Sequence, residues 1–303
     1  MKVLSVSEKD FDTILQADSI ETHHGSGLFV CGTYSLRNDS VSGRRWREGL
    51  IHLLDARGPL SSSLHSVSCG GVLDLKWSGQ LLASVESEAG FALFRLSEDD
   101  DSGGKKKEMM LLETQRGKLD RKSQCLMQTA PESLINLSVD WQSPHRLAIS
   151  HDDGSLSLWN VGNSEIQNVA WWDAHDNEAW IVAAHKQNVD VFWSGADDGL
   201  LRGWDSRAGF AKRKHTFQVK SEAGVTSIMP SVHDPHTWAV GGYDEELRLF
   251  DDRNTVAPLS RLPQLGGGVW RIKLRRMACL FFCCFLRIWF FFLFLIFFVQ
   301  VAS

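Results

Sequence analysis

The amino-acid sequence predicts an all-β protein of the β-propeller class, with about five recognisable blades and the first strand of a sixth. Short segments in which apolar and polar residues alternate recur along the chain, and such alternation is typical of β-strands. A similar apolar stretch closes each group of segments. Once one polar insert is set aside, these stretches recur about every 40–45 residues, which is the length of a four-stranded blade.

Each repeat unit opens with an apolar segment that we expect to form its first strand. The opening segments are GVLDLKW (71–77), LINLSVDW (134–141), AWIVAAH (179–185), GVTSIMP (224–230) and GVWRIK (268–273). A second apolar run follows in four of them, as LLASV, RLAIS, VFWSG and TWAVGG. A tight turn and a third strand then complete the pattern. We therefore expect blades at approximately 22–57, 71–97, 134–161, 178–206 and 224–252.

The third strand of each unit ends with an aromatic residue or a leucine in a fixed slot. The closing stretches are GLIHLLD (49–55), AGFALFR (89–95), GSLSLWN (154–160), GLLRGWD (199–205) and EELRLFD (245–251). The Trp-Asp ending of one of them is the signature of a WD repeat. The longest gap between slots holds SEDDDSGGKKKEMM (97–110), and its charges and glycines predict a solvated loop.

An acidic residue stands six positions before the slot in every unit. These residues are Glu48, Glu88, Asp153, Asp198 and Asp244. A catalytic acid would occur once, so the recurrence indicates turn architecture, in which a carboxylate accepts hydrogen bonds from nearby amides. In the unit that ends in Trp-Asp, four residues have the spacing of the buried hydrogen-bond tetrad of WD-repeat proteins: His175, Ser194, Asp198 and Trp204. We expect this tetrad to be structural and not a Ser-His-Asp catalytic triad.

Composition excludes several classes of function. The formal net charge of −5 argues against binding to nucleic acid, which needs clustered Lys and Arg. The six cysteines are scattered without paired metal-ligand spacing, so we expect free thiols, no metal and no cofactor. The N-terminus has no apolar run of a secretory signal, which favours the cytoplasm, alone or together with the nucleus.

The repeat pattern stops at Leu274, and we expect two parts: an incomplete propeller over residues 1–273 and an apolar tail over 274–303. Two interpretations of the tail stay open. Residues 277–299 are long enough to span a bilayer as a C-terminal anchor, and only then would a membrane be a partner. The alternative is translated noncoding sequence, because Phe, Leu, Ile, Val and Cys dominate it.

Several stretches exceed what a generic WD repeat requires. They are ADSIE (17–21), FVCGTYSLR (29–37), WWDAHDNEAWIVAAH (171–185), SGADDGLLRGWDSR (194–207), KRKHTFQ (212–218), GGYDEELRLFDDRN (241–254) and GGGVWRIK (266–273). Together they closely resemble the diphthine methyl ester hydrolase family, WD-repeat proteins of the diphthamide pathway. The resemblance covers nearly all of residues 13–273 and ends at Leu274, where the family would continue through further blades. It therefore implies a truncated chain.

The resemblance implies a carboxylic ester hydrolase. The family removes the methyl ester from over-methylated diphthine, a modified histidine of translation elongation factor 2, so that the carboxylate can be amidated to diphthamide. Elongation factor 2 is thus the implied partner. The residues themselves do not show this chemistry, since the chain has no G-x-S-x-G elbow and no His-Glu-x-x-His zinc helix. A non-catalytic scaffold or adaptor, or an inactive truncated isoform, are the alternatives.

Candidate site residues are those that the propeller fold itself does not require. His215 does not align with the tetrad histidine, whose position is Ser221 in that unit, and together with Glu178 it is a candidate general base. Candidate substrate-binding residues are Trp180, Tyr243, Trp270 and Arg271. Each has a structural alternative: a loop histidine, a surface charge, or tryptophans that pack in the core. Direct attack by water is preferred over a protein nucleophile.

Overall fold

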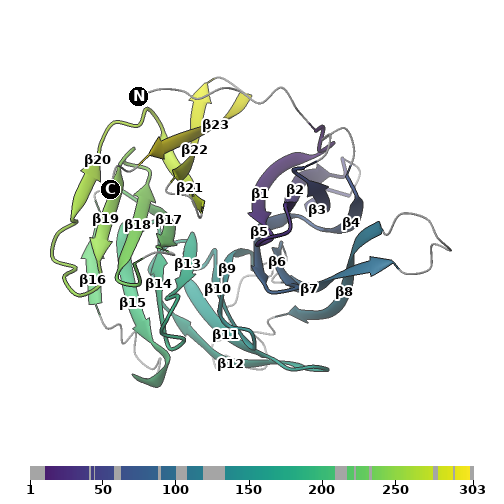
Figure 1. Cartoon of the computed structure of the whole chain (residues 1–303), viewed down its shortest axis with the longest axis horizontal. Coiled ribbons are helices and arrows are strands. Elements are labelled where there is room, and N and C mark those ends of the chain that lie inside the picture. The colour runs from purple at the N-terminus through teal and green to yellow at the C-terminus, as the bar shows by residue number, and fades with distance from the viewer. Residues whose placement is uncertain are drawn as a thin grey trace. The chain divides into compact units, whose positions relative to one another are not determined.

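The computed structural model describes residues 11–40, 42–43, 45–57, 63–87, 90–99, 108–118, 134–208, 217–221, 223–231, 234–275, 279–288 and 291–300. Almost all of the regular structure in these ranges is β-strand, with one short 3-10 turn at Ser206–Ala208 (Figure 1). No helix within them is long and apolar enough to cross a membrane.

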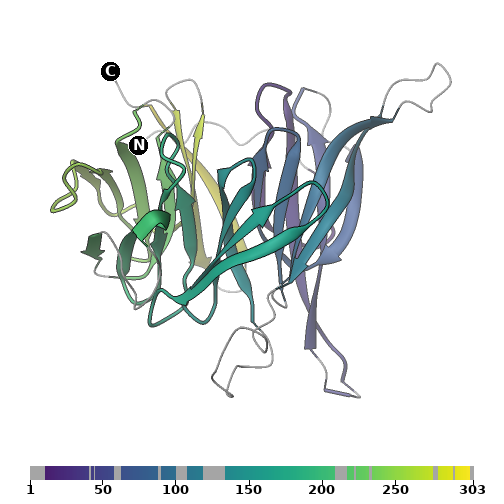
Figure 2. The same cartoon turned by 90° about the horizontal axis from the view of Figure 1, so that it is seen from below.

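Within the described ranges the strands form six antiparallel sheets, five with four strands and one with three. Figures 1 and 2 show the strands of each sheet side by side. The first three sheets contain β1 Gln16–Thr22, β2 Leu28–Asn38, β3 Arg45–Asp55 and β4 His65–Gly70; β5 Val72–Ser78, β6 Leu81–Glu86, β7 Gly90–Asp99 and β8 Glu108–Lys118; and β9 Asn136–Ser143, β10 Arg146–His151, β11 Ser155–Val161 and β12 Ile166–Asp173. The last three contain β13 Ile181–Ala184, β14 Val191–Gly195, β15 Leu200–Asp205 and β16 Phe217–Lys220; β17 Val225–Pro230, β18 Thr237–Gly242, β19 Leu247–Asp251 and β20 Ser260–Leu262; and β21 Gly268–Arg275, β22 Cys279–Ile288 and β23 Phe291–Gln300.

The chain divides into two compact units. The N-terminal unit comprises Ser7–His151 and Leu158–Val169, and the C-terminal unit includes Asp152–Ser157 and Ala170–Ser303. The first two sheets lie in the N-terminal unit and the last three in the C-terminal unit, while β11 and β12 each pass from one unit to the other.

The inner strands of the sheets are buried on both faces, because neighbouring sheets pack against them. In β10, β11, β13 and β14 nearly every residue is buried, including small polar ones. The fourth strands differ, since one of their faces meets solvent: β4 and β12 alternate between exposed and half-buried residues, and β20 is exposed throughout. This gradient follows from stacking sheets face to face, which leaves only the outermost strand beside water.

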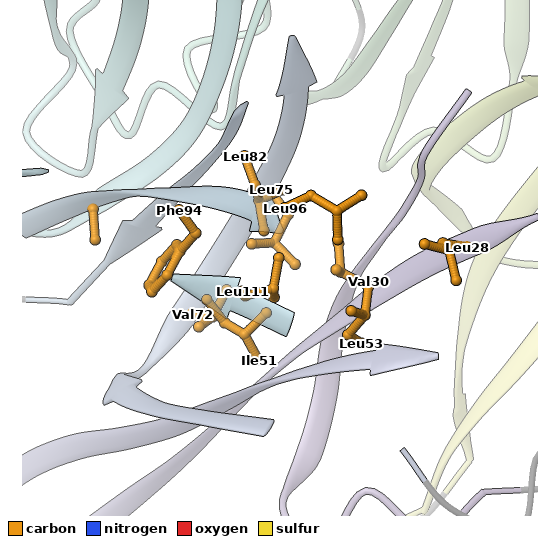
Figure 3. Packing of buried hydrophobic residues seen from close by; sticks show 11 residues of the cluster. Leu28, Val30, Ile51, Leu53, Val72, Leu75, Leu82, Phe94, Leu96 and Leu111 are labelled. Atoms are coloured by element: carbon orange, nitrogen blue, oxygen red, sulfur yellow. The ribbon is translucent and has the colours of Figure 1, made fainter. Parts of the chain in front are cut away.

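Each unit has an apolar core built from facing strands. In the N-terminal unit, side chains from β2, β3, β5, β6, β7 and β8 form one cluster, with Val30, Ile51 and Leu75 fully buried at its centre (Figure 3). In the C-terminal unit, Trp193 and Trp238 stack with ring centroids 5.1 Å apart, and Trp238 stacks on Phe250 at 5.0 Å. Aromatic stacking of this kind adds to the free energy gained by burying the rings.

Glycines allow neighbouring sheets to approach closely. A Cβ atom on Gly195, at the end of β14, would lie 2.3 Å from Val225 Cγ1 of the next sheet. A Cβ on Gly241 of β18 would lie 2.4 Å from Val269 Cγ1 in the same way. The valine at the start of one sheet therefore packs into the space that a glycine leaves on the sheet before it.

The structure confirms the all-β propeller class and the first three strands of four of the five expected blades. The first blade was expected at 22–57, but its first strand, β1, lies earlier, at Gln16–Thr22. The structure also adds the fourth strands, which the sequence pattern did not reveal. The insert at 97–110 was expected to be a loop throughout, but β7 continues to Asp99 and β8 begins at Glu108. Cys31 and Cys69, the described cysteines with placed side chains, are free as expected.

The sixth sheet also extends beyond the expectation of a single strand. The segment GVWRIK forms β21, which continues through Leu274 to Arg275 and pairs with β22, and β22 pairs with β23. Residues 279–288 and 291–300 are thus strands and not parts of a spanning helix. The division into parts at residue 273 stays a prediction.

Candidate functional site

The four residues of the WD-repeat spacing form one hydrogen-bonded chain. Trp204 Nε1 donates to Ser194 Oγ at 2.8 Å, and Ser194 Oγ lies 2.7 Å from His175 Nε2. His175 Nδ1 lies 3.1 Å from Asp198 Oδ2. One assignment of protons satisfies all three contacts: the Ser194 hydroxyl donates to Nε2, and Nδ1–H donates to the carboxylate.

Burial fixes the charges of this tetrad. Desolvation lowers the pKa of His175, so its ring is neutral at neutral pH. Burial alone would raise the pKa of Asp198, but hydrogen bonds from His175 and from the amides of Leu200 and Asp176 outweigh it, and the pKa is lowered. The order Ser-His-Asp is that of a hydrolase triad. Ser194 is 0% exposed, however, so no substrate can reach its hydroxyl in this fold.

The fifth sheet builds a variant of the same network. Ser221 stands where the tetrad histidine would be, and its Oγ donates to Asp244 Oδ2 at 3.1 Å. Arg248 Nη1 donates to Ser221 Oγ at 3.1 Å, and Arg248 also pairs with Asp244. The repeat acid thus has a structural partner in this unit too, in agreement with the expectation that the recurring acids serve the fold.

The candidate substrate-binding aromatics meet in the C-terminal unit. Trp180 immediately precedes β13, Tyr243 immediately follows β18, and Trp270 lies in β21. The rings of Trp180 and Trp270 meet edge to face with centroids 5.3 Å apart. The ring of Tyr243 lies 6.1 Å from that of Trp270. Three sheets therefore contribute one aromatic cluster, which we call the aromatic triad: Trp180, Tyr243 and Trp270.

Two carboxylates accompany the aromatic triad. Glu178, two residues before Trp180, is half-buried, and its backbone carbonyl accepts a hydrogen bond from the amide of Asp197 at 3.0 Å. Asp197 is exposed. Both Asp197 and Tyr243 lie against Gly224. A Cβ on this glycine would lie 2.5 Å from Asp197 Oδ1 and 3.0 Å from Tyr243 Cδ2. Glycine at this position leaves room for both side chains.

The environment of Tyr243 shows how these groups act on one another. Burial, and after it the negative charges of Asp197 and Glu178, raise the pKa of Tyr243 to about 12. The phenol is therefore protonated at neutral pH and is a hydrogen-bond donor. At the same time 44% of Tyr243 is exposed, so a ligand can reach it.

Other predicted residues are placed less centrally. Arg271 follows Trp270 in β21, is paired across the sheet with Cys283, and its Nε is buried. His215 lies outside the described residues. Sequence reasoning missed Asp197, although a signal was present: Asp197 stands immediately before the repeat acid of its unit, as Tyr243 does in the next. Among the described residues no group of three His, Cys, Asp or Glu side chains could hold a metal ion.

The repeated four-stranded sheets and the buried tetrad define a WD-repeat β-propeller protein. Several of its relatives carry the name diphthine methyltransferase. Diphthine methyltransferase of Mus musculus is 34% identical over 297 residues, which are 86% of this chain and 57% of the mouse protein. Diphthine methyltransferase of Homo sapiens is 33% identical over 305 residues, which are 86% of this chain and 62% of the human protein.

A more distant relative shows the same relationship. The diphthine methyltransferase homolog of Dictyostelium discoideum is 27% identical over 290 residues, covering 85% of this chain and 74% of that protein. These relatives confirm the family resemblance drawn from the sequence. The chain spans about three fifths of the length of its mouse and human relatives. No protein-family profile matches it.

Proposed function

We propose that this chain acts in diphthamide biosynthesis and hydrolyses the methyl ester of methylated diphthine on translation elongation factor 2. The observation that carries the proposal is the similarity along 86% of the chain to proteins named diphthine methyltransferase. The aromatic triad and its carboxylates support it, because they gather side chains that the propeller does not need. The proposed site is the surface formed by Glu178, Asp197 and the aromatic triad.

Ester hydrolysis needs a base for water and a donor for the oxyanion. In the proposed reaction a carboxylate, Glu178 or Asp197, takes one proton from a water molecule. The water oxygen bonds to the ester carbonyl carbon, and the carbonyl oxygen becomes an oxyanion. The Tyr243 hydroxyl donates a hydrogen bond to that oxyanion. The bond between the carbonyl carbon and the methoxy oxygen then breaks, and the methoxy oxygen takes the proton that the side-chain carboxyl holds and leaves as methanol. The carboxylic acid that remains releases its proton to solvent and becomes the carboxylate product.

The remaining candidates have supporting places in this proposal. Arg271 lies next to Trp270 in β21, and a guanidinium suits the carboxylate that the hydrolysis forms. His215 is the alternative base, in a segment outside the described residues. No cofactor is proposed, since water and the ester are the only reactants.

The assay follows the intact mass of elongation factor 2 that carries the methyl ester of diphthine. Loss of one methylene unit above the no-protein control supports hydrolysis. Gain of a methylene unit in the presence of a methyl donor would instead support the methyl transfer that the relatives' name describes. If the mass of elongation factor 2 does not change although the chain binds it, the result would support a non-catalytic platform.

Variants assign the base. Glu178→Gln and Asp197→Asn keep the shape of each side chain and remove its charge, and the variant that lowers turnover about 10²-fold or more identifies the base. Glu165→Gln is the matched control, because Glu165 is an exposed carboxylate of the N-terminal unit. His215→Ala, with exposed His24→Ala as its control, tests the alternative. Full turnover in all three test variants, Glu178→Gln, Asp197→Asn and His215→Ala, contradicts the assignment.

A further inference from the structure

Trp270 occupies an irregular position in its strand. The register of β21 with β22 shifts between Val269 and Arg271, and Trp270 is the extra residue of this β-bulge. A bulge interrupts the regular alternation of side chains along a strand and gives its residue a new direction. From this position the indole of Trp270 meets the rings of Trp180 and Tyr243. The geometry of the aromatic triad therefore depends on how the bulge is held.

Two side chains of the preceding sheet hold the backbone around this bulge. Thr226 and Ser227 are consecutive residues of β17, and each is 2% exposed. The Thr226 hydroxyl donates to the carbonyl oxygen of Val269 at 2.6 Å. Ser227 Oγ accepts a hydrogen bond from the amide of Ile272 at 3.0 Å. The two hydroxyls thus fix both ends of the segment that carries the candidate substrate-binding residues of β21.

The contact of Ser227 belongs to a pattern of the fold. In the N-terminal unit Asp74 of β5 accepts a hydrogen bond from the amide of Val139 in β9 at 3.3 Å, which links two first strands in the same way. A contact that recurs in another part of the propeller serves the stacking of its sheets. Ser227 is therefore explained by the architecture.

The contact of Thr226 is additional to this pattern. Thr226 is itself the extra residue of a bulge, since the register of β17 with β18 shifts at this place. β5 and β9 have a bulge at the corresponding place, and the extra residues there are Leu73 and Leu137. A leucine side chain has no hydrogen-bond donor. The repeat therefore does not require the hydroxyl of Thr226, which is directed to the carbonyl group that leads into Trp270.

The energetics of this contact favour a fixed bulge. Gly241 O lies 3.4 Å from the same hydroxyl, but a hydroxyl has one proton, and the shorter contact to Val269 is the stronger one. Val269 is fully buried, so water does not replace the donor if the hydroxyl is removed. The bulge would then be free to change its direction, and the indole of Trp270 with it.

We infer that Thr226 is a positioning residue of the proposed site, whose hydroxyl fixes the bulge that presents Trp270 to the substrate. The inference rests on the proposed function, because it takes the aromatic triad as the surface that contacts the substrate. Thr226 acts through Trp270 and has no contact with the reacting atoms.

The orientation of Trp270 can be measured without a substrate. Two indoles with centroids 5.3 Å apart and planes inclined by 61° couple their electronic transitions, which gives a pair of circular dichroism bands of opposite sign. The difference between each protein and the same protein with Trp180→Phe isolates this pair. Thr226→Val keeps the shape of the side chain and removes the donor, so it should weaken the paired bands. Thr226→Ser keeps the hydroxyl and should preserve them.

Turnover of elongation factor 2 that carries the methyl ester gives the second measurement. A misdirected Trp270 weakens substrate binding and leaves the base in place. Thr226→Val should therefore raise KM roughly threefold to tenfold and leave kcat within roughly twofold, and Thr226→Ser should restore KM.

Thr33→Val is the matched control. Thr33 is fully buried in the N-terminal unit, and its hydroxyl donates to the carbonyl oxygen of Leu50 at 3.2 Å. This variant should leave the paired bands and KM at their wild-type values. Paired bands that are unchanged in Thr226→Val, or weakened equally in Thr33→Val, contradict the positioning role. If Thr226→Val does not fold, Thr226→Ala removes the same donor, and a folded Thr226→Ser variant without the paired bands also contradicts the role.

The two proposals fail separately. Paired bands that respond to Thr226→Val in a chain that removes no methyl group from elongation factor 2 leave the position of Trp270 explained and remove the hydrolase. Hydrolysis at an unchanged KM in Thr226→Val, with weakened paired bands, leaves the hydrolase and removes the role of Thr226 in presenting Trp270 to the substrate.

Discussion

The indole of Trp204 donates a hydrogen bond of 2.8 Å to the hydroxyl of Ser194, and both side chains are completely buried. Ser194 holds two partners at once, since its oxygen also lies 2.7 Å from His175 Nε2. A single hydroxyl thereby joins β14 and β15 to the loop before β13. Removing it would leave one buried donor and one buried acceptor without partners.

Ser194→Ala is therefore expected to destabilise the C-terminal unit by about 1–3 kcal/mol, the cost of leaving buried polar groups unpaired. Urea denaturation followed by tryptophan fluorescence measures it. Ser164→Ala, at an exposed serine, is the control and should match the wild type. Equal denaturation midpoints for both variants would show that the buried hydrogen bonds of Ser194 add nothing to the stability of the protein.

The tetrad also predicts a dependence of stability on pH. Burial lowers the pKa of His175 in the folded protein below the ordinary value near 6.5, so the unfolded chain takes up the proton first as the pH falls. Stability should therefore be full above about pH 6.5 and should decrease below it. The denaturation midpoint at pH 7.5 and at pH 5.5 measures the loss. His175→Gln should reduce the difference between the two midpoints, and an unchanged difference would contradict a neutral His175.

The packing of neighbouring sheets gives a prediction about volume. Gly195→Ala would place a Cβ 2.3 Å from Val225 Cγ1, and overpacking of this kind costs about 1–3 kcal/mol. Val225→Ala in the same chain makes room, so the double variant should lose less than the sum of the two single losses. Gly90→Ala is the matched control, since a Cβ on this strand residue meets nothing closer than 3.9 Å. Strict additivity would show that the two residues do not share this space.

In the N-terminal unit, one buried carboxylate forms hydrogen bonds to the first strands of two other sheets. Asp74 of β5 is 1% exposed and accepts hydrogen bonds from Ser19 of β1 at 3.2 Å and from Ser138 of β9 at 2.7 Å. In the wild type, Asp74 Oδ2 also accepts a hydrogen bond from the Val139 amide at 3.3 Å. Asp74→Asn replaces one carboxylate oxygen, an acceptor, with an NH2 group, a donor.

We expect Asp74→Asn to cost about 2–3 kcal/mol, since hydrogen bonds to a charged group are the stronger ones. Hydrogen exchange should become faster for the amides of β5 and β9 in this variant. Asp173→Asn, at an exposed aspartate, is the control. Unchanged exchange in Asp74→Asn would mean that the carboxylate is dispensable.

The sequence predicted those parts of the fold in which each repeat needs the same type of residue at the same position. Trp204 and its counterparts recur because every third strand must fill the same space between sheets. The acids Asp153, Asp198 and Asp244 recur because each accepts a hydrogen bond from an amide of its turn. Glu48 differs from this expectation, since it lies within β3 and pairs with Arg37. The sequence did not predict the fourth strands, because one of their faces meets solvent and the apolar pattern of the inner strands is absent from them. Ser260–Leu262 of β20, for example, is exposed throughout and gives no periodic signal.

The candidate site was predicted in part. Trp180, Tyr243 and Trp270 stood out as residues that the propeller does not require, but their mutual contact depends on three separate sheets. Asp197 was hidden by its neighbour: the pair Asp197–Asp198 suggested one turn, whereas the two carboxylates have different surroundings. Asp198 bonds to a buried histidine, and Asp197 lies exposed beside Tyr243. Only spatial proximity separates these roles.

The protonation of Tyr243 gives the most direct test of the site. The chain has two tyrosines, and burial raises the pKa of both: that of Tyr243 to about 12, and that of Tyr34 above its ordinary value. The folded protein should therefore show little tyrosinate absorbance at pH 10, where the unfolded chain is about half ionised. The sign for stability follows: stability is complete below about pH 10 and decreases above it, because the unfolded chain releases its protons first.

Variants assign that titration to the site. Asp197→Asn and Glu178→Gln each remove a negative charge that raises the pKa of Tyr243, so each should move the absorbance titration to lower pH. Tyr34→Phe isolates the signal of Tyr243, and Glu165→Gln is the control that should leave it in place. A titration of Tyr243 that neither charge-removing variant moves would show that the carboxylates lie too far from the ring to act on it. The same result would remove them from the proposed reaction, because that reaction depends on their proximity to Tyr243.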